Sequence, residues 1–206
     1  GELETRDLLK REKEVLGFYV SANPLDEYRE YLPLLTTYQV ADLKSDLSDT
    51  YVRVAGTIIN LNRRVSRRGD SYARFLLEDL SGRIEVMVFP SAYRRVGEKL
   101  EADQVVVLEG YLDTREEQAK ISLRRFQPIP TRLREIDIRI EDRNNSEDNK
   151  DAMVKTLRKY PGDLEVILHL PGRRVMVLND NLKIKPVIEL KEKLAVLYGR
   201  ENIWFA

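Results

Sequence analysis

The sequence predicts a β barrel plus an α+β unit: a five-stranded barrel followed by a small domain of mixed helices and strands. Three observations indicate this class. Apolar and polar residues alternate through the middle of the chain, a proline-led helical stretch interrupts the alternation after three predicted strands, and strands then alternate with helices. At 206 residues the chain is long enough for two compact units. We assign residues 1–50 to a helical connector, 51–128 to the barrel and 129–206 to the small α/β domain.

The connector is predicted to begin as a helix. Apolar side chains recur at three- and four-residue spacing over 3–21, which indicates an amphipathic helix. The helix is expected to end at Asn23, because the following Pro24 disfavours helix in the residue before it. Residues 28–47 are broken by Pro33 and two threonines, so we expect short pieces packed against their neighbours.

Three strands are expected next. Alternation of period two predicts the first strand over 51–58, and a polar loop follows over 60–71. A second strand over 72–78 and a third over 83–89 form a hairpin. They flank Asp79-Leu80-Ser81-Gly82, a tight turn in which glycine can take a positive φ.

A helix then separates these strands from two more. Pro90 stands at the first-turn position that proline favours, and the helix runs to about Leu100. The last two strands cover 104–113 and 118–127, joined by a charged turn. Three strands, a helix and two strands, in that order, are typical of the OB-fold, a five-stranded and partly open barrel.

The remaining elements follow in the order β-α-β-β-α-β, over 133–140, 153–160, 164–170, 173–178, 186–198 and 202–205. A polar loop over 142–151 leads into the first helix, and Gly199 stands where a C-terminal cap favours glycine. This order predicts the ferredoxin-like, split βαβ topology for the small domain. Trp204 and Phe205 are expected in its core, with an exposed anchor for a protein partner as the alternative.

Composition excludes several classes of protein. The 35 Lys and Arg residues are matched by 35 Asp and Glu, so any nucleic-acid contact must come from local patches. Without cysteine and with one histidine, the chain cannot be a disulfide scaffold, a zinc finger or a cysteine hydrolase. No apolar run approaches the roughly 20 residues of a membrane span, and the acidic start does not resemble a signal peptide. We therefore expect a soluble, cytoplasmic protein or a piece of one.

Catalytic chemistry has little support in the residues. His169 ends a predicted strand, where a structural or surface role is the simpler interpretation, and Asp79 is expected to accept backbone hydrogen bonds in its turn. There is no glycine-rich phosphate loop and no pairing of nucleophile and base. The sequence predicts no catalytic residue, no metal site and no cofactor.

Nucleic-acid binding is better supported, by the loop between the first two predicted strands. Arg63, Arg64, Arg67 and Arg68 lie within it, opposed there only by Asp70. Guanidinium groups on such a loop can hold phosphates with forked hydrogen bonds, independently of base sequence. The alternative is a solvated, solubilising hairpin loop.

Outward-facing residues of the neighbouring strands extend this candidate site. If Ile84, Val86 and Val88 face the barrel interior, then the residues between them face outward. Stacking of a base on an exposed aromatic ring contributes about 1–3 kcal/mol, although Phe89 could equally cover the barrel core. Cations near the loop between the last two strands flank the same groove, the one in which OB-folds bind single strands. The set therefore adds Tyr72, Arg74, Arg83, Phe89, Arg115 and Lys120.

Three blocks, in this order, resemble the alpha subunit of bacterial DNA polymerase III. The first covers 12–25 and reads EKEVLGFYVS followed by Asn-Pro-Leu, with Asn23 where the family usually has histidine. The second, FLLEDLSGRIEVMVFP at 75–90, is similar to strands two and three of that subunit's OB-fold, and the third begins with Tyr-Pro-Gly-Asp at 160–163. An OB-fold block alone also occurs in tRNA synthetases, whereas the three together are specific.

The resemblance implies the C-terminal region of a polymerase subunit, without the palm domain and its metal-binding aspartates. In the family, the OB domain contacts single-stranded template, and the C-terminal domain contacts the clamp-loader tau subunit in some lineages. The expected partners are therefore single-stranded DNA, the rest of the polymerase chain and tau, in the bacterial cytoplasm. Two alternatives stay open: a protein-interaction module that docks tau, and the anticodon-binding OB-fold of a tRNA synthetase.

Overall fold

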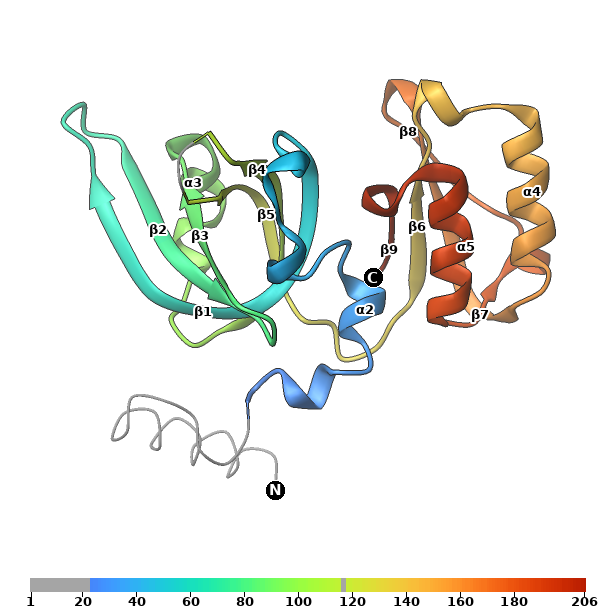
Figure 1. The fold of residues 1–206 in the computed structure, drawn as a ribbon, viewed down its shortest axis with the longest axis horizontal. Helices are drawn as coiled ribbons and strands as arrows, with labels where there is room; N and C mark the ends of the chain where they lie inside the picture. The colour runs from blue at the N-terminus through green and yellow to red at the C-terminus, as the bar shows by residue number, and fades with distance from the viewer. Residues whose placement is uncertain (1–22, 116–117) are drawn as a thin grey trace.

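The computed structural model describes residues 23–115 and 118–206, and shows a closed five-stranded barrel beside a second, four-stranded sheet (Figure 1). The amphipathic helix predicted over 3–21 lies outside the described residues. None of the helices in the described ranges is long and apolar enough to cross a membrane.

The barrel confirms the predicted OB-fold. Its strands are ordered β1-β2-β3-β5-β4, and all neighbours are antiparallel except β3 and β5, which run parallel. Helix α3, continued by a 3-10 turn over Gly97–Lys99, lies between the third and fourth strands in sequence. The element bounds are β1 Tyr51–Val65, β2 Ser71–Glu78, β3 Arg83–Val88, α3 Pro90–Val96, β4 Val105–Asp113 and β5 Lys120–Pro128.

Alternation along β2 and β3 sets which side chains enter the barrel. Phe75, Val86 and Val88 are buried in its core, as the period-two pattern predicts. The residues between them face outward, and Arg74 and Phe89 are exposed. The outer face of β2 and β3 is therefore part of the solvent-exposed surface of the barrel.

The predicted loop over 60–71 is wrong over half its length, because β1 continues to Val65. Asn60 has a φ of 54°, and the register with β2 shifts between Ile59 and Asn62, which marks a β-bulge. A bulge bends a strand without ending it, and four of the six residues from Asn60 to Val65 are polar, so the sequence pattern indicates a loop for this segment. Arg63 therefore lies on a strand and not in a loop.

The second sheet is ordered β8-β7-β6-β9 and carries its two helices on one face (Figure 1). The apolar core lies between that face and the helices, and it includes Phe205. The element bounds are β6 Glu135–Arg139, α4 Glu147–Leu157, β7 Pro161–Leu170, β8 Arg174–Val177, α5 Ile188–Tyr198 and β9 Ile203–Phe205.

The split βαβ topology predicted for this sheet is wrong, although the element order is as expected. In a split unit another strand lies between the two strands that flank the first helix, whereas β6 pairs directly with β7, in parallel. Strand β9 then adds to the other edge of β6, antiparallel. Local pattern reports the order of elements and not their partners, so the sequence could not decide between the two arrangements.

Helix α4 begins earlier than predicted, inside the expected loop over 142–151. Ser146 is its N-cap, and the Ser146 hydroxyl accepts a hydrogen bond from the Asn149 amide at 3.2 Å. Polar residues fill the first turn, which is why hydrophobic periodicity missed it.

The described part of the connector consists of short pieces that contact both sheets. It contains α2, Leu32–Leu35, and 3-10 turns at Asp26–Tyr28, Val40–Asp42 and Ser45–Leu47. Leu34 packs into the core of the second sheet, while Leu35 packs with Ala55 on the outside of the barrel. The connector therefore joins the barrel to the second sheet through buried contacts.

Candidate nucleic-acid interface

The outer face of β2 and β3 brings cations and rings together at the end nearest the β1–β2 turn. Arg64 lies opposite Tyr72, and Arg74 lies opposite Met87 in the strand register. Phe89 directly follows Val88 on β3 and is 47% exposed. The ring that could have covered the barrel core is therefore on the surface.

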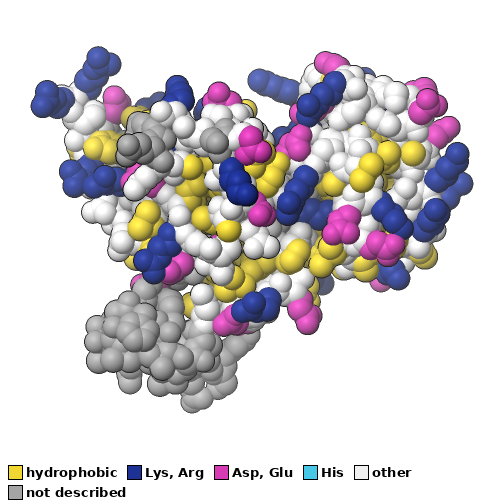
Figure 2. Space-filling model, in the orientation of Figure 1, with side chains coloured by type: hydrophobic (Ala, Val, Ile, Leu, Met, Phe, Trp, Pro, Cys, Tyr) yellow, Lys and Arg dark blue, Asp and Glu magenta, His cyan; other side chains and the backbone are white. Residues whose placement is uncertain are grey.

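The β1–β2 turn holds two further arginines at its tip. The Ser66 hydroxyl accepts hydrogen bonds from the amides of Arg68 at 3.3 Å and Asp70 at 3.1 Å, and Gly69 takes a φ of 85°. The turn backbone is thus fixed, while Arg67 and Arg68 extend into solvent without an ion pair to any described residue. Figure 2 shows the dark blue side chains that project beyond the end of this hairpin.

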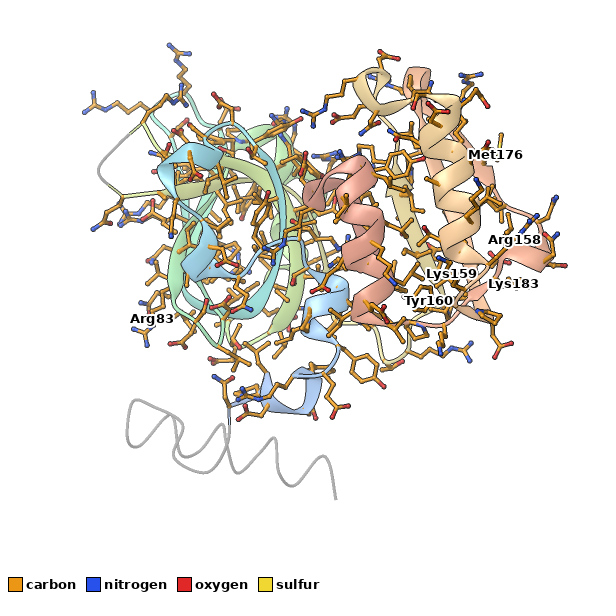
Figure 3. The ribbon with its side chains drawn as sticks, turned by 45° about the vertical axis from the view of Figure 1, so that its right-hand side comes forward. Arg83, Arg158, Lys159, Tyr160, Met176 and Lys183 are labelled. Atoms are coloured by element: carbon orange, nitrogen blue, oxygen red, sulfur yellow. The ribbon has the colours of Figure 1, made fainter. Side chains whose placement is uncertain are left out.

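Four of the predicted site residues do not join this group. Arg63 points the other way from Arg64 along the strand, and its guanidinium donates to the Leu100 carbonyl. Arg83 pairs with Glu78 at 2.6 Å and lies six residues before Phe89, about 20 Å away along β3. Figure 3 shows Arg83 at the far edge of the barrel.

The other two lie around the β4–β5 connection. Arg115 pairs with Asp113 at 2.7 Å, and these hydrogen bonds hold the pKa of the Asp113 carboxyl well below its usual range. Lys120 lies opposite Asp113 on β4 and Glu85 on β3 in the strand register. The structure thus gathers Arg64, Arg67, Arg68, Tyr72, Arg74 and Phe89, and separates Arg63, Arg83, Arg115 and Lys120 from them.

Sequence reasoning missed a second group on the same barrel. Tyr111 on β4 is 42% exposed, and the Arg124 guanidinium lies 5.3 Å from the centre of its ring. Arg124 and Arg125 are both exposed because the register of β4 and β5 shifts between Glu109 and Gly110. Two adjacent arginines in a strand were the available signal, but the bulge that turns both outward is not visible in the sequence.

The contacts of three other residues bear on the interpretations made from the sequence. The Asp79 carboxylate accepts hydrogen bonds from the amides of Ser81 and Gly82 at 2.7 and 2.8 Å, as predicted for its turn. His169 Nε2 lies 2.6 Å from Asp137 Oδ1, and the His169 side chain is half-buried. The predicted place of Trp204 in the core is wrong: Phe205 lies in the core between the sheet and its helices, whereas Trp204 is buried on the opposite face of the sheet, because neighbouring residues of a strand point to opposite faces. In the described ranges no three His, Asp or Glu side chains are grouped as a metal site would need.

Residues 52–129 match the family model described as OB-fold nucleic acid binding domain, which covers the barrel. The DNA polymerase III subunit alpha of Aquifex aeolicus is 42% identical over 112 residues, 54% of this chain and 10% of the relative. That of Mycobacterium tuberculosis (strain CDC 1551 / Oshkosh) is 31% identical over 207 residues, 96% of this chain. The predicted resemblance to the alpha subunit of bacterial DNA polymerase III is confirmed.

The match to the alpha subunit of Mycobacterium tuberculosis extends through both the barrel and the second sheet, and it covers 18% of that relative. The chain thus spans less than a fifth of the alpha subunits it matches. Among solved structures, an asparaginyl-tRNA synthetase from Pyrococcus horikoshii has 19% identity over 45% of this chain and 22% of that chain, with a TM-score of 0.36.

Proposed function

We propose that this chain is a non-catalytic part of a bacterial replicative polymerase alpha subunit that binds single-stranded template DNA, in the cytoplasm. The observation that carries the proposal is a grouping at one end of the outer face of β2 and β3: arginines with no ion pair to a described residue lie beside the exposed Phe89 ring and the half-buried Tyr72 ring. The match to alpha subunits over both sheets favours this over a tRNA synthetase, whose resemblance rested on the OB-fold alone.

The chemistry of the group suits an unpaired strand. Arg64, Arg67 and Arg68 can donate forked hydrogen bonds to successive phosphates, and none of them is neutralised by a carboxylate of the described residues. Tyr72 and Phe89 supply faces on which bases stack, an interaction available only when the bases are not paired within a duplex. The site should therefore prefer single strands without strong base preference.

Replacing Arg64, Arg67 and Arg68 together by alanine is expected to weaken single-strand binding roughly tenfold or more. The slope of log affinity against log salt should become shallower by about 2, since each lost phosphate contact removes about 0.7. Fluorescence anisotropy with labelled single-stranded and duplex oligonucleotides across a salt series measures both quantities.

The matched control removes three exposed cations from the end of α4, by replacing Lys155, Arg158 and Lys159 with alanine. It has the same change of net charge at a site far from the barrel, where Figure 3 labels Arg158 and Lys159. Equal salt slopes for the two triple variants would overturn the proposed DNA-binding role of the arginines.

A second candidate function, docking of a protein partner, is favoured by β8. This strand is at the edge of the second sheet, and Val175, Met176 and Val177 are 62%, 49% and 54% exposed. An edge strand offers unpaired backbone groups to an added strand. Arg158 and Lys183 lie on the same outer side in Figure 3, which suits an acidic partner segment. We propose tau as that partner.

Replacing Met176 with lysine is expected to weaken tau binding at least tenfold. The lysine would place a charged group in the contact between the apolar β8 strand and tau, where burying the charge is costly. Val196→Lys, at an 86% exposed position on α5, is the control that should leave binding unchanged. Surface plasmon resonance with purified tau measures this, and wild-type affinity of the Met176→Lys variant would exclude β8 as the docking edge.

A further inference from the structure

A cleft of about 580 Å³ lies where the barrel meets the second sheet; we name it the junction cleft. One wall is the outside of β1, β4 and β5, and the other is formed by β6, β7 and β9. Side chains alternate across the second sheet, so Ile136 and Ile138 pack toward the helices while Asp137 and Arg139 line the cleft. The cleft therefore lies on the sheet face that α4 and α5 leave uncovered.

Arginines from both walls converge on the junction cleft. Arg124 and Arg125 come from the β5 bulge, Arg95 comes from α3, and Arg139 comes from β6. The Arg139 guanidinium lies 5.0 Å from the ring centre of Tyr51 and 5.2 Å from that of Trp204. These two ring contacts restrict the orientation of the Arg139 guanidinium.

Two of the three carboxylates that line the cleft have partners. Glu109 pairs with Arg53 and accepts a hydrogen bond from the Tyr51 hydroxyl at 2.7 Å. Asp137 pairs with His169, and Glu135 is the third carboxylate, against five arginines in the lining. Arg95, Arg124, Arg125 and Arg139 consequently have no ion pair within the described residues, and the cleft carries an unbalanced positive charge.

The barrel surface connects this cleft to the outer face of β2 and β3. Arg74 lies opposite Met87, Met87 opposite Ser122, and Ser122 opposite Tyr111, in one row across four strands. Three steps of about 4.8 Å make the row about 14 Å long. Its far end is the exposed Tyr111 ring with Arg124 stacked on it, at the rim of the cleft.

We propose that the junction cleft binds phosphates of the same single strand after it leaves the outer face of β2 and β3. The inference rests on the proposed DNA binding and extends it to a second contact, shared between the barrel and the second sheet. Forked hydrogen bonds from Arg125 and Arg139 hold the phosphates, and Tyr111 supports a base at the entrance. Occupancy of both contacts requires a strand longer than the first face alone can hold.

The test compares short and long oligothymidylates, of about 6 and about 16 nucleotides, on the 206-residue chain. In the Arg124→Ala/Arg125→Ala variant we expect affinity for the long strand to fall fivefold to tenfold and its salt slope to fall by about 1.4, with short-strand affinity unchanged. The control, Lys155→Ala/Lys159→Ala, removes the same charge at the end of α4 and should leave both affinities as in wild type.

The outcomes separate this inference from the function on which it rests. If the wild-type chain binds neither strand, the proposed DNA binding fails. If it binds both and the Arg124→Ala/Arg125→Ala variant equals its control, the cleft inference alone is overturned.

A competition experiment identifies the kind of ligand that the cleft binds. If pyrophosphate lowers the affinity for the long strand to that for the short strand, the cleft is a phosphate site. Displacement by an acidic peptide with no effect of pyrophosphate would make the cleft a protein site and overturn the inference. Arg125→Glu, at an exposed position, serves as a second variant that should deepen the loss.

Discussion

Replacing Glu109 with leucine is expected to lower the free energy of unfolding by about 3–5 kcal/mol. The Arg53 and Glu109 side chains are only 6% and 14% exposed, and their charged ends pair directly. Arg53 also donates through Nε to the Leu35 carbonyl at 2.8 Å, which ties β1 to α2. Without Glu109 the guanidinium would stay buried with no carboxylate, and burial already lowers the pKa of Arg53. Urea denaturation followed by circular dichroism measures the loss.

Two further variants test whether the buried, unpaired charge of Arg53 causes this loss of stability. Arg53→Met with Glu109→Leu removes both charges, and we expect it to recover most of the lost stability, because an apolar pair of similar volume replaces a buried ion pair at little cost. Glu189→Leu breaks the exposed pair with Lys193, which is 47% exposed, and should cost less than about 1 kcal/mol. Equal losses in Glu109→Leu and Glu189→Leu would contradict the role of burial.

Replacing Lys191 with methionine is expected to lower the free energy of unfolding by about 2–4 kcal/mol, since buried carbonyls left without donors cost about 1–3 kcal/mol each. Lys191 on α5 is 6% exposed. Its Nζ donates to the carbonyls of Pro33 at 2.6 Å, Leu34 at 3.1 Å and Thr36, at the end of α2. It therefore satisfies carbonyls that a helix end leaves free.

This substitution should also remove a dependence of stability on pH. Burial, with Arg200 and Arg53 nearby, lowers the pKa of Lys191 from 10.5 to about 7. Between these values the unfolded chain binds more protons at this residue than the folded chain, so wild-type stability gains at most about 1.4 kcal/mol per pH unit as pH rises through the window. The difference in unfolding free energy between wild type and Lys191→Met should grow from pH 7 to pH 9.5, and a constant difference would contradict the lowered pKa.

Both substitutions act on the contacts that connect the connector to the two sheets. Arg53 reaches α2 from the barrel, and Lys191 reaches it from the second sheet. The junction cleft is bounded by the same two sheets, so these buried polar contacts connect its two walls through α2.

The barrel was predictable from the sequence, because alternation of period two shows which side chains of a strand face a core. The Asp79 turn and the resemblance to polymerase alpha subunits followed from local pattern, whereas the position of Phe89 did not, because its ring could equally face outward or cover the barrel core. The same local signals placed the β7–β8 hairpin and the last strand.

Contacts between residues far apart in the sequence were not predictable from local pattern. Alternation does not specify which strand pairs with which, so the direct pairing of β6 with β7 was not predicted. The bulges that extend β1 past Asn60 and turn Arg124 and Arg125 outward together are set by register with neighbouring strands. Arg139 and Trp204 meet the barrel arginines at the junction cleft because packing, and not sequence proximity, brings two sheets together.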